Sequence, residues 1–214
     1  MAKRRWDLRD CILYLILDTD VYDYEMLFDI MEKAVTAGVD IVQLRDKHGS
    51  CRNILQFSIR CMKALAGRVP FIVNDRVDIA YACGADGVHL GQEDLPVDKA
   101  REILGKDAII GISCQSMEDA RHAEESGADY IGFGSVFKTL TKPDRQPMDL
   151  NLLAEVCKQI RIPVFAIGGI GISNLSVILN VGVGRIAVCR AISKANDVSG
   201  IVKDMKTMLS NSFR

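Results

Sequence analysis

Eight short, almost wholly apolar runs alternate along the chain with segments whose apolar residues recur at helical spacing. The apolar runs are Ile12–Leu17, Ile41–Leu44, Phe71–Val73, Gly87–Leu90, Ile109–Ile112, Tyr130–Phe133, Pro163–Ile167 and Ile186–Val188. The helical segments are Tyr24–Ala37, Asn53–Ala66, Val77–Cys83, Val97–Leu104, Met117–Ser126, Leu150–Ile160, Asn174–Val181 and Val198–Leu209. Runs this apolar are typical of parallel strands buried on both faces. Eight such strands, each followed by a helix, predict an α/β fold that closes as a (β/α)8 TIM barrel.

A repeated tetrapeptide supports the barrel over an open doubly wound sheet. Ala37–Asp40, Cys83–Asp86 and Ser126–Asp129 each end a helix with Gly before an Asp that leads into a strand, and Val181–Gly184 is a degenerate copy. The open sheet is further disfavoured because no Gly-x-Gly-x-x-Gly fingerprint follows the first strand. We therefore expect residues 1–214 to form one domain, with a polar lead-in at 1–11 and an active-site flap at 134–149 at the mouth of the barrel.

Charge and cysteine usage exclude several classes of partner. The 27 Lys and Arg residues nearly cancel the 28 Asp and Glu residues, so no global field favours nucleic acid or anionic lipid. The seven cysteines are scattered without a Cys-x-x-Cys pair, which indicates free thiols in a reducing cytoplasm. The N-terminal apolar run is too short for a signal peptide or a membrane span. We expect a cytoplasmic enzyme of small phosphorylated molecules, and the sequence leaves a homo-oligomer open.

Residues able to do chemistry gather where the expected strands end, which in a barrel is one face. They are Gln43, Arg45, Lys47, Asn74, Asp75, Gln92, Asp94, Ser113, Thr139, Thr141, Lys142, Gly168–Gly171, Cys189 and Arg190. Asp75 and Asp94 follow adjacent strands and match the one or two carboxylates by which Mg²⁺ is usually held. Either aspartate alone would more often be a turn former or a helix cap.

The basic residues and glycines suggest two phosphate sites. Arg45 and Lys47 lie beside the aspartates, where contact with a diphosphate competes with weak surface pairing to Asp46 or Glu93. The glycines of Gly168–Gly171 can expose N–H groups to a second phosphate at the start of a helix.

No Ser/His/Asp or Cys/His arrangement is evident, and His89 is interpreted as a packed, hydrogen-bonded core residue. This inventory predicts an enzyme that joins a diphosphate ester to a second phosphorylated molecule.

Seven segments spread over most of the chain resemble the thiamine-phosphate synthase family. They are VQLRDK (Val42–Lys47), FIVNDRVDIA (Phe71–Ala80), GADGVHLGQEDLP (Gly84–Pro96), IIGIS (Ile109–Ser113), GADYIGFG (Gly127–Gly134), TLTK (Thr139–Lys142) and AIGGI (Ala166–Ile170). The resemblance implies a transferase that condenses an aminopyrimidine diphosphate with a thiazole phosphate, giving thiamine phosphate and diphosphate. The implied mechanism is dissociative and assisted by Mg²⁺.

The resemblance also implies a role for individual residues. The pyrimidine diphosphate site would contain Gln43, Leu44, Arg45, Asp46, Lys47, Asn74, Ser113 and Lys142, with Lys47, Ser113 and Lys142 catalytic. Mg²⁺ would be held by Asp75 and Asp94. The thiazole phosphate would be held by Thr139, Leu140, Thr141, Gly169, Cys189 and Arg190.

Three positions depart from the family pattern. Leu140 replaces the proline of a Thr-Pro-Thr motif, Ser135 stands where synthases usually carry proline and related thiazole tautomerases tend to carry histidine, and Arg190 replaces a serine. Arg190 either strengthens phosphate binding by its charge or obstructs the site by its bulk. A thiazole tautomerase and a non-catalytic thiamine-phosphate-binding barrel therefore remain alternatives.

Overall fold

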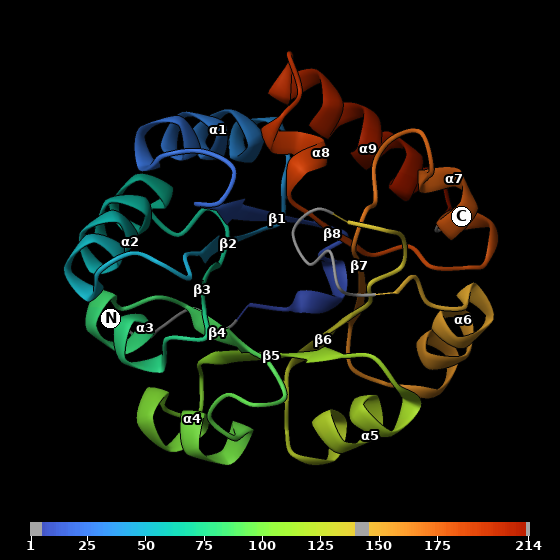
Figure 1. Ribbon diagram of the computed structural model, residues 1–214, viewed down its shortest axis with the longest axis horizontal. Coiled ribbons are helices and arrows are strands. Elements are labelled where there is room, and N and C mark those ends of the chain that lie inside the picture. The colour runs from blue at the N-terminus through green and yellow to red at the C-terminus, as the bar shows by residue number, and fades with distance from the viewer. Residues whose placement is uncertain (1–5, 140–145, 213–214) are drawn as a thin grey trace.

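A computed structural model, which describes residues 6–139 and 146–212, shows a closed barrel of parallel strands inside a ring of helices (Figure 1). Each strand pairs with the next along the chain, and β8 closes onto β1. The strands are β1 (Leu13–Asp18), β2 (Ile41–Arg45), β3 (Phe71–Asn74), β4 (Gly87–Leu90), β5 (Ile109–Cys114), β6 (Tyr130–Phe133), β7 (Val164–Ile167) and β8 (Ile186–Val188). The predicted fold class, a (β/α)8 barrel, is confirmed.

The surrounding helices follow the expected segments closely. They are α1 (Tyr24–Ala37), α2 (Cys51–Leu65), α3 (Val77–Cys83), α4 (Val97–Leu104), α5 (Met117–Glu125), α6 (Leu150–Gln159), α7 (Leu175–Asn180) and α9 (Val198–Ser212). The sequence did not predict α8 (Arg190–Ser193), a single turn that starts directly after β8 and is too short to show a helical period. No helix in the described ranges is both long and apolar enough to cross a membrane.

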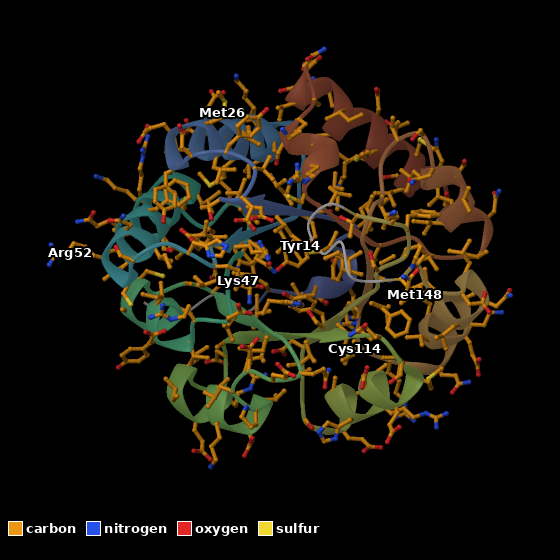
Figure 2. All side chains as sticks on the ribbon, viewed as in Figure 1. Tyr14, Met26, Lys47, Arg52, Cys114 and Met148 are labelled. Atoms are coloured by element: carbon orange, nitrogen blue, oxygen red, sulfur yellow. The ribbon has the colours of Figure 1, made fainter. Side chains whose placement is uncertain are left out.

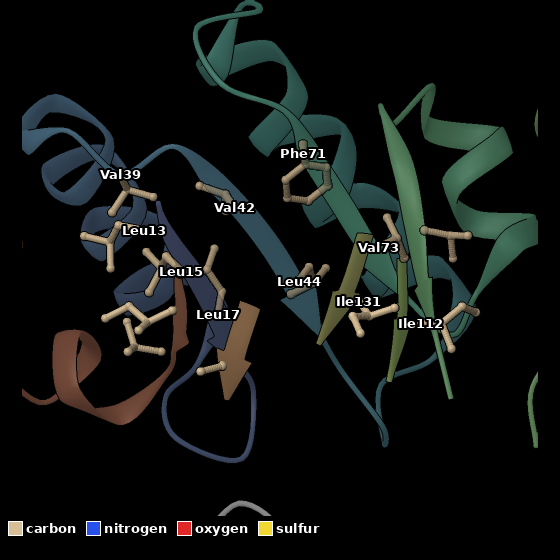
Figure 3. Close-up of a cluster of buried hydrophobic side chains, with 14 of the residues drawn as sticks. Leu13, Leu15, Leu17, Val39, Val42, Leu44, Phe71, Val73, Ile112 and Ile131 are labelled. Carbon is tan, nitrogen blue, oxygen red and sulfur yellow. The ribbon is translucent and has the colours of Figure 1, made fainter. Parts of the chain in front are cut away.

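The strands separate two cores, because successive side chains of a strand point to opposite faces. Leu13, Leu15 and Leu17 of β1 point outward into the layer beneath the helices, which Leu44 and Val73 also join (Figure 3). Tyr14 and Ile16 of the same strand belong to the other core, inside the barrel. The inner core consists of Leu8, Cys11, Tyr14, Ile16, Ile41, Ile72, Ile109, Tyr130, Phe165 and Ala187. All six β1 residues are buried, as expected of a strand covered on both faces.

The aspartates of the repeated tetrapeptide fasten the end of the barrel opposite the mouth. Asp40 Oδ2 accepts the N–H groups of Ile12 and Leu13 at 2.8 and 2.9 Å. Asp86 and Asp129 do the same near the start of neighbouring strands, accepting from Phe71 N, the first residue of β3, at 2.9 Å and from Ile110 N, the second residue of β5, at 2.8 Å. Each copy therefore satisfies backbone donors that begin a strand, which is a structural role.

The described part of the lead-in covers the same end. A short 3₁₀ helix, η1 (Leu8–Asp10), places Leu8 in the inner core, and the indole Nε1 of Trp6 donates to Asp86 Oδ1 at 3.1 Å. The described residues of the lead-in therefore cover the inner core at the end opposite the mouth.

Candidate active site

A cavity of about 820 Å³ opens at the carboxyl ends of the strands. It brings together most of the residues predicted from the strand ends, contributed by strands from β2 to β8. Those that line it are Gln43, Arg45, Lys47, Asn74, Asp75, Gln92, Asp94, Ser113, Thr139, Gly168–Gly171, Cys189 and Arg190. Leu140, Thr141 and Lys142 lie outside the described residues. The volume is in the range of small-molecule sites, so the ring can enclose a ligand.

Two predicted site residues turn away from the cavity. Leu44 is 1% exposed and packs in the outer core, which Figure 3 shows. The Asp46 carboxylate accepts a hydrogen bond from the Tyr24 hydroxyl and others from the N–H groups of His48 and Gly49 at 3.0 and 2.6 Å. The side chains of Leu44 and Asp46 therefore face away from the cavity, because alternate residues of an extended segment face opposite sides, and their predicted place in the pyrimidine diphosphate site stays a prediction.

Asp75 and Asp94 form a carboxylate pair at the ends of β3 and β4. Asp75 adopts the left-handed backbone conformation, with φ 61°, and its N–H donates to His89 O at 2.8 Å. Lys47 Nζ pairs with the Asp75 carboxylate, and Asp94 Oδ2 accepts from Gly91 N at 2.6 Å. Burial raises the pKa of Asp75, the Lys47 ammonium opposes that rise, and the neighbouring Asp94 carboxylate adds to it.

The helix-cap alternative for these two aspartates does not hold. The residue that caps α3 is Arg76 and the one that caps α4 is Pro96, and neither helix has a side-chain cap. Two adjacent carboxylates with an ammonium at their side suit a divalent cation shared with a phosphate ligand. Within the described residues no group of three or more His, Cys, Asp or Glu side chains is placed to hold a metal ion, so the pair would need ligands from water or substrate.

Arg45 is held by two acidic residues that the sequence did not suggest as its partners. Its Nη1 lies 2.9 Å from Asp18 Oδ1 and 2.9 Å from Asp20 Oδ2, in the β1 end and the turn after it. Asp18 is fully buried, so this pair is shielded from water. Arg45 faces the cavity as part of an ion-pair cluster, and Lys47 is the more exposed of the two cations.

The glycines after β7 allow the loop after β6 to pack closely against them, in addition to any role in ligand binding. A Cβ on Gly168 would lie 2.1 Å from Ser135 Oγ, and one on Gly169 would lie 2.5 Å from Lys138 O. Both have positive φ, 104° and 65°. Gly171 N already donates to Asn174 Oδ1 at 2.8 Å, so this N–H is not open to a phosphate as the sequence suggested.

Arg190 and Lys138 both line this side of the cavity and bring positive charge to it. The Nε of Arg190 is buried and has no hydrogen-bond partner in the described part of the chain. The neighbouring Cys189 is no nucleophile near neutral pH, because burial, followed by the nearby Asp18 charge, raises the pKa of its thiol to about 12.

Sequence reasoning missed a group of inward-facing polar and aromatic residues at the floor of the cavity. Tyr14 and Tyr130 stand at inner positions of β1 and β6, and Figure 2 shows Tyr14 near the centre of the ring of strands. They contact Phe165 edge-on, with ring centroids 5.5 and 5.6 Å away. His89, 7% exposed, is hydrogen-bonded as expected of a core histidine, yet it also lines the cavity. The signal that could have identified them is a polar side chain at an inward position of an otherwise apolar strand.

The fold and site define a parallel (β/α)8 barrel whose mouth carries cations, a carboxylate pair and a glycine turn, an arrangement suited to phosphorylated ligands. A model of the family described as thiamine monophosphate synthase matches residues 13–192. The chain belongs to this family.

Several known proteins are similar to this chain in sequence, and others are similar to it in structure. The chain is 43% identical to a thiamine-phosphate synthase of Halalkalibacterium halodurans over 94% of this chain and 97% of that one. It is 42% identical to one of Clostridium acetobutylicum, with coverage of 88% and 90%. The structure of thiamine phosphate pyrophosphorylase from Pyrococcus furiosus superposes with a TM-score of 0.88 at 35% identity, covering 97% of this chain and all of that one. The structure of a 3-hexulose-6-phosphate synthase shares the fold, with a TM-score of 0.69 and 18% identity. The match covers 92% of this chain and 98% of that one.

Proposed function

We propose that the protein is a thiamine-phosphate synthase that condenses 4-amino-2-methyl-5-(diphosphooxymethyl)pyrimidine with the thiazole phosphate, releasing diphosphate. The observation that supports this proposal is one cavity with basic or polar groups suited to phosphate on two sides. Lys47 and Ser113 stand with the carboxylate pair on one side, and Arg190 with the β7 glycine turn stands on the other. Two phosphorylated substrates can therefore bind together, with the methylene carbon of the pyrimidine and the nitrogen of the thiazole facing each other between the phosphates.

On the diphosphate side, the protein would stabilise the leaving group. Lys47 would exchange its contact with Asp75 for a phosphate oxygen, and the Ser113 hydroxyl would donate to another. Asp75 and Asp94 would hold Mg²⁺, which neutralises charge on the departing diphosphate when bound. Lys142, outside the described residues, is proposed to assist there. We propose that diphosphate leaves first and that the thiazole nitrogen then attacks the resulting pyrimidine cation.

On the thiazole side, the protein would mainly position its ligand. Arg190 would bind the phosphate through its guanidinium, and Thr139 and Gly169 border the same space. The aromatic floor of Tyr14, Tyr130 and Phe165 provides an apolar surface beneath the reacting rings. Holding both reactants in line replaces a bimolecular encounter by a step within one complex, which lowers the entropic cost of reaction.

A thiazole tautomerase is less well supported because it needs a proton-transfer group in the loop after β6. Ser135, at the position in question, is 8% exposed and its Oγ donates to Phe137 O at 2.8 Å. Its hydroxyl is thus engaged within its own loop. A barrel that only binds thiamine phosphate would not need a pair of carboxylates next to Lys47.

The deciding experiment incubates the purified protein with both substrates and Mg²⁺ and follows thiamine phosphate and diphosphate together. Equal amounts of the two products support the synthase. Isomerisation of the thiazole without condensation would establish the tautomerase. Tight binding of thiamine phosphate without turnover, under conditions where a known synthase works, would establish the binding barrel.

A further inference from the structure

A continuous chain of hydrogen bonds crosses the inside of the barrel and ends in the cavity. Gln43 Nε2 donates to Tyr14 Oη at 2.7 Å, and Tyr14 Oη lies 2.8 Å from Tyr130 Oη. Tyr130 Oη lies 3.0 Å from His89 Nδ1, and His89 Nε2 lies 2.9 Å from Ser113 Oγ. Five residues from five strands, β1, β2, β4, β5 and β6, are thereby linked.

This chain lies where barrels usually place branched apolar side chains. Four of its members are buried: the exposed fraction is 3% for Gln43, 1% for Tyr14, 0% for Tyr130 and 7% for His89. Burial, ahead of every other effect, raises the pKa of both phenols, so both remain neutral and keep a proton to donate. A buried polar chain is costly unless every member is satisfied, and here each has a partner.

Two glycines make room for the rings. A Cβ at Gly111 in β5 would lie 2.1 Å from Tyr130 Cζ, and one at Gly132 in β6 would lie 3.3 Å from His89 Cε1. Glycine weakens a strand interior, so its presence at both positions fits a site where other groups approach closely. The rings are thus confined at fixed distances from one another.

The contacts among these five described residues are consistent with one direction of donation. Gln43 Nε2 can only donate, so Tyr14 must pass its own proton to Tyr130 Oη, the other partner of its hydroxyl. Tyr130 then donates to His89 Nδ1, which leaves the proton of the neutral imidazole on Nε2. His89 Nε2–H donates to Ser113 Oγ, and the Ser113 proton is left to point into the cavity.

We propose that this chain holds Ser113 as a hydrogen-bond donor toward the anionic leaving group, with His89 and Tyr130 as positioning residues that act through it. The identity of the anion rests on the proposed function, whereas the direction of the chain does not. Without Tyr130 Oη, His89 Nδ1 loses its donor. The imidazole can then carry its proton on Nδ1 and accept from Ser113, which turns the serine proton away from the ligand.

The first test reads the His89 tautomer by ¹⁵N nuclear magnetic resonance, without substrate. The protein has three histidines, and loss of one set of signals in His89→Gln assigns the buried one. We expect the Nε2–H form in the wild type and in Tyr14→Phe, where Tyr130 keeps its donation to His89, and a shift toward the Nδ1–H form in Tyr130→Phe. Tyr14→Phe is the matched control, since it removes a buried hydroxyl from the same cluster. An Nδ1–H wild type, or identical spectra for Tyr130→Phe and wild type, overturns the proposal.

The second test uses inorganic diphosphate with Mg²⁺ as the probe and measures its dissociation constant by calorimetry. We expect Ser113→Ala and Tyr130→Phe each to weaken binding about ten-fold, the effect of roughly one hydrogen bond to a charged group. Because Tyr130 acts through Ser113, the double variant should bind no more weakly than Ser113→Ala alone. Additive losses would refute the coupling. His89→Gln, whose amide can still donate to Ser113, should bind more tightly than His89→Leu, and equal losses would contradict the assigned donor.

These results are separable from the proposed function. Failure of the wild type to form thiamine phosphate would refute the synthase, while the tautomer and the coupling would stand. If the wild type has normal synthase activity but the Ser113 and Tyr130 substitutions weaken diphosphate binding additively, only the proposed role of the hydrogen-bond chain is refuted.

Discussion

Replacing the carboxylate pair by amides should remove the response of the protein to Mg²⁺ while leaving the metal-free fold intact. The variant is Asp75→Asn/Asp94→Asn. Asparagine tolerates the left-handed conformation of residue 75, where φ is 61°, whereas alanine would add about 1 kcal/mol of backbone strain. An amide oxygen at residue 94 can still accept from Gly91 N. The substitution therefore removes charge without removing the turn contacts.

The direction in which the substitution changes the stability of the metal-free protein follows from the raised pKa of Asp75, which is caused first by burial. A carboxylate whose folded pKa lies above its unfolded value contributes stability at low pH and loses it as pH rises through the folded pKa. At pH 7 without metal, the variant should thus be at least as stable as the wild type. Mg²⁺ at about 100 times its dissociation constant should stabilise the wild type by about 2.7 kcal/mol, or roughly 5–10 °C in Tm for a chain of this size.

Thermal unfolding at pH 7, with and without Mg²⁺, measures both effects. The matched control is Asp78→Asn/Asp98→Asn, which removes two exposed charges at the second residues of α3 and α4 and should keep the full Mg²⁺ response. An equal Mg²⁺ response in the Asp75/Asp94 variant would refute the metal assignment. A metal-free variant markedly less stable than the wild type would refute the argument from the raised pKa.

Three further outcomes are expected. Gly111→Ala should lower the free energy of unfolding by about 1–3 kcal/mol in a denaturant titration, because its methyl group meets the fully buried Tyr130 ring; an unchanged midpoint would show that the ring can move. The pKa of half-buried Cys189, raised to about 12, should keep its thiol unalkylated at pH 8 while exposed Cys51 reacts, as peptide mass spectrometry can check; equal labelling would contradict this. Arg190→Ser should raise KM for the thiazole phosphate about ten-fold, and a lower KM would show that the guanidinium obstructs the site.

The arrangement of strand ends could be predicted because a barrel brings them to one face whatever the loops do. Within Gln43–Lys47, side chains of an extended segment alternate between two faces, so the sequence also indicates that Leu44 and Asp46 point away from the cavity. The family resemblance alone assigns all five residues to one site. The binding of Arg45 by Asp18 and Asp20 was not predictable, since it depends on the turn after β1.

The inner hydrogen-bond chain was the least accessible to sequence reasoning. Tyr14 and Tyr130 are 116 positions apart, and their hydroxyls meet only because barrel closure sets the height of each strand. His89 could be interpreted as a hydrogen-bonded core residue, but its partners depend on that register. The role of Leu140, Thr141 and Lys142 stays a prediction.

The loop that leaves β6 is fastened at its base on two sides. Val136 N and Phe137 N donate to Ile167 O and Gly168 O at 2.9 and 3.0 Å, and Met148 N returns to Ser135 O at 2.9 Å. Changes of length between these anchor points cost little closure entropy and leave the barrel hydrogen bonds untouched. The barrel thus fixes the base of this loop independently of the length of the segment between the anchor points, and exchanging that segment between relatives is a route to altered ligand preference.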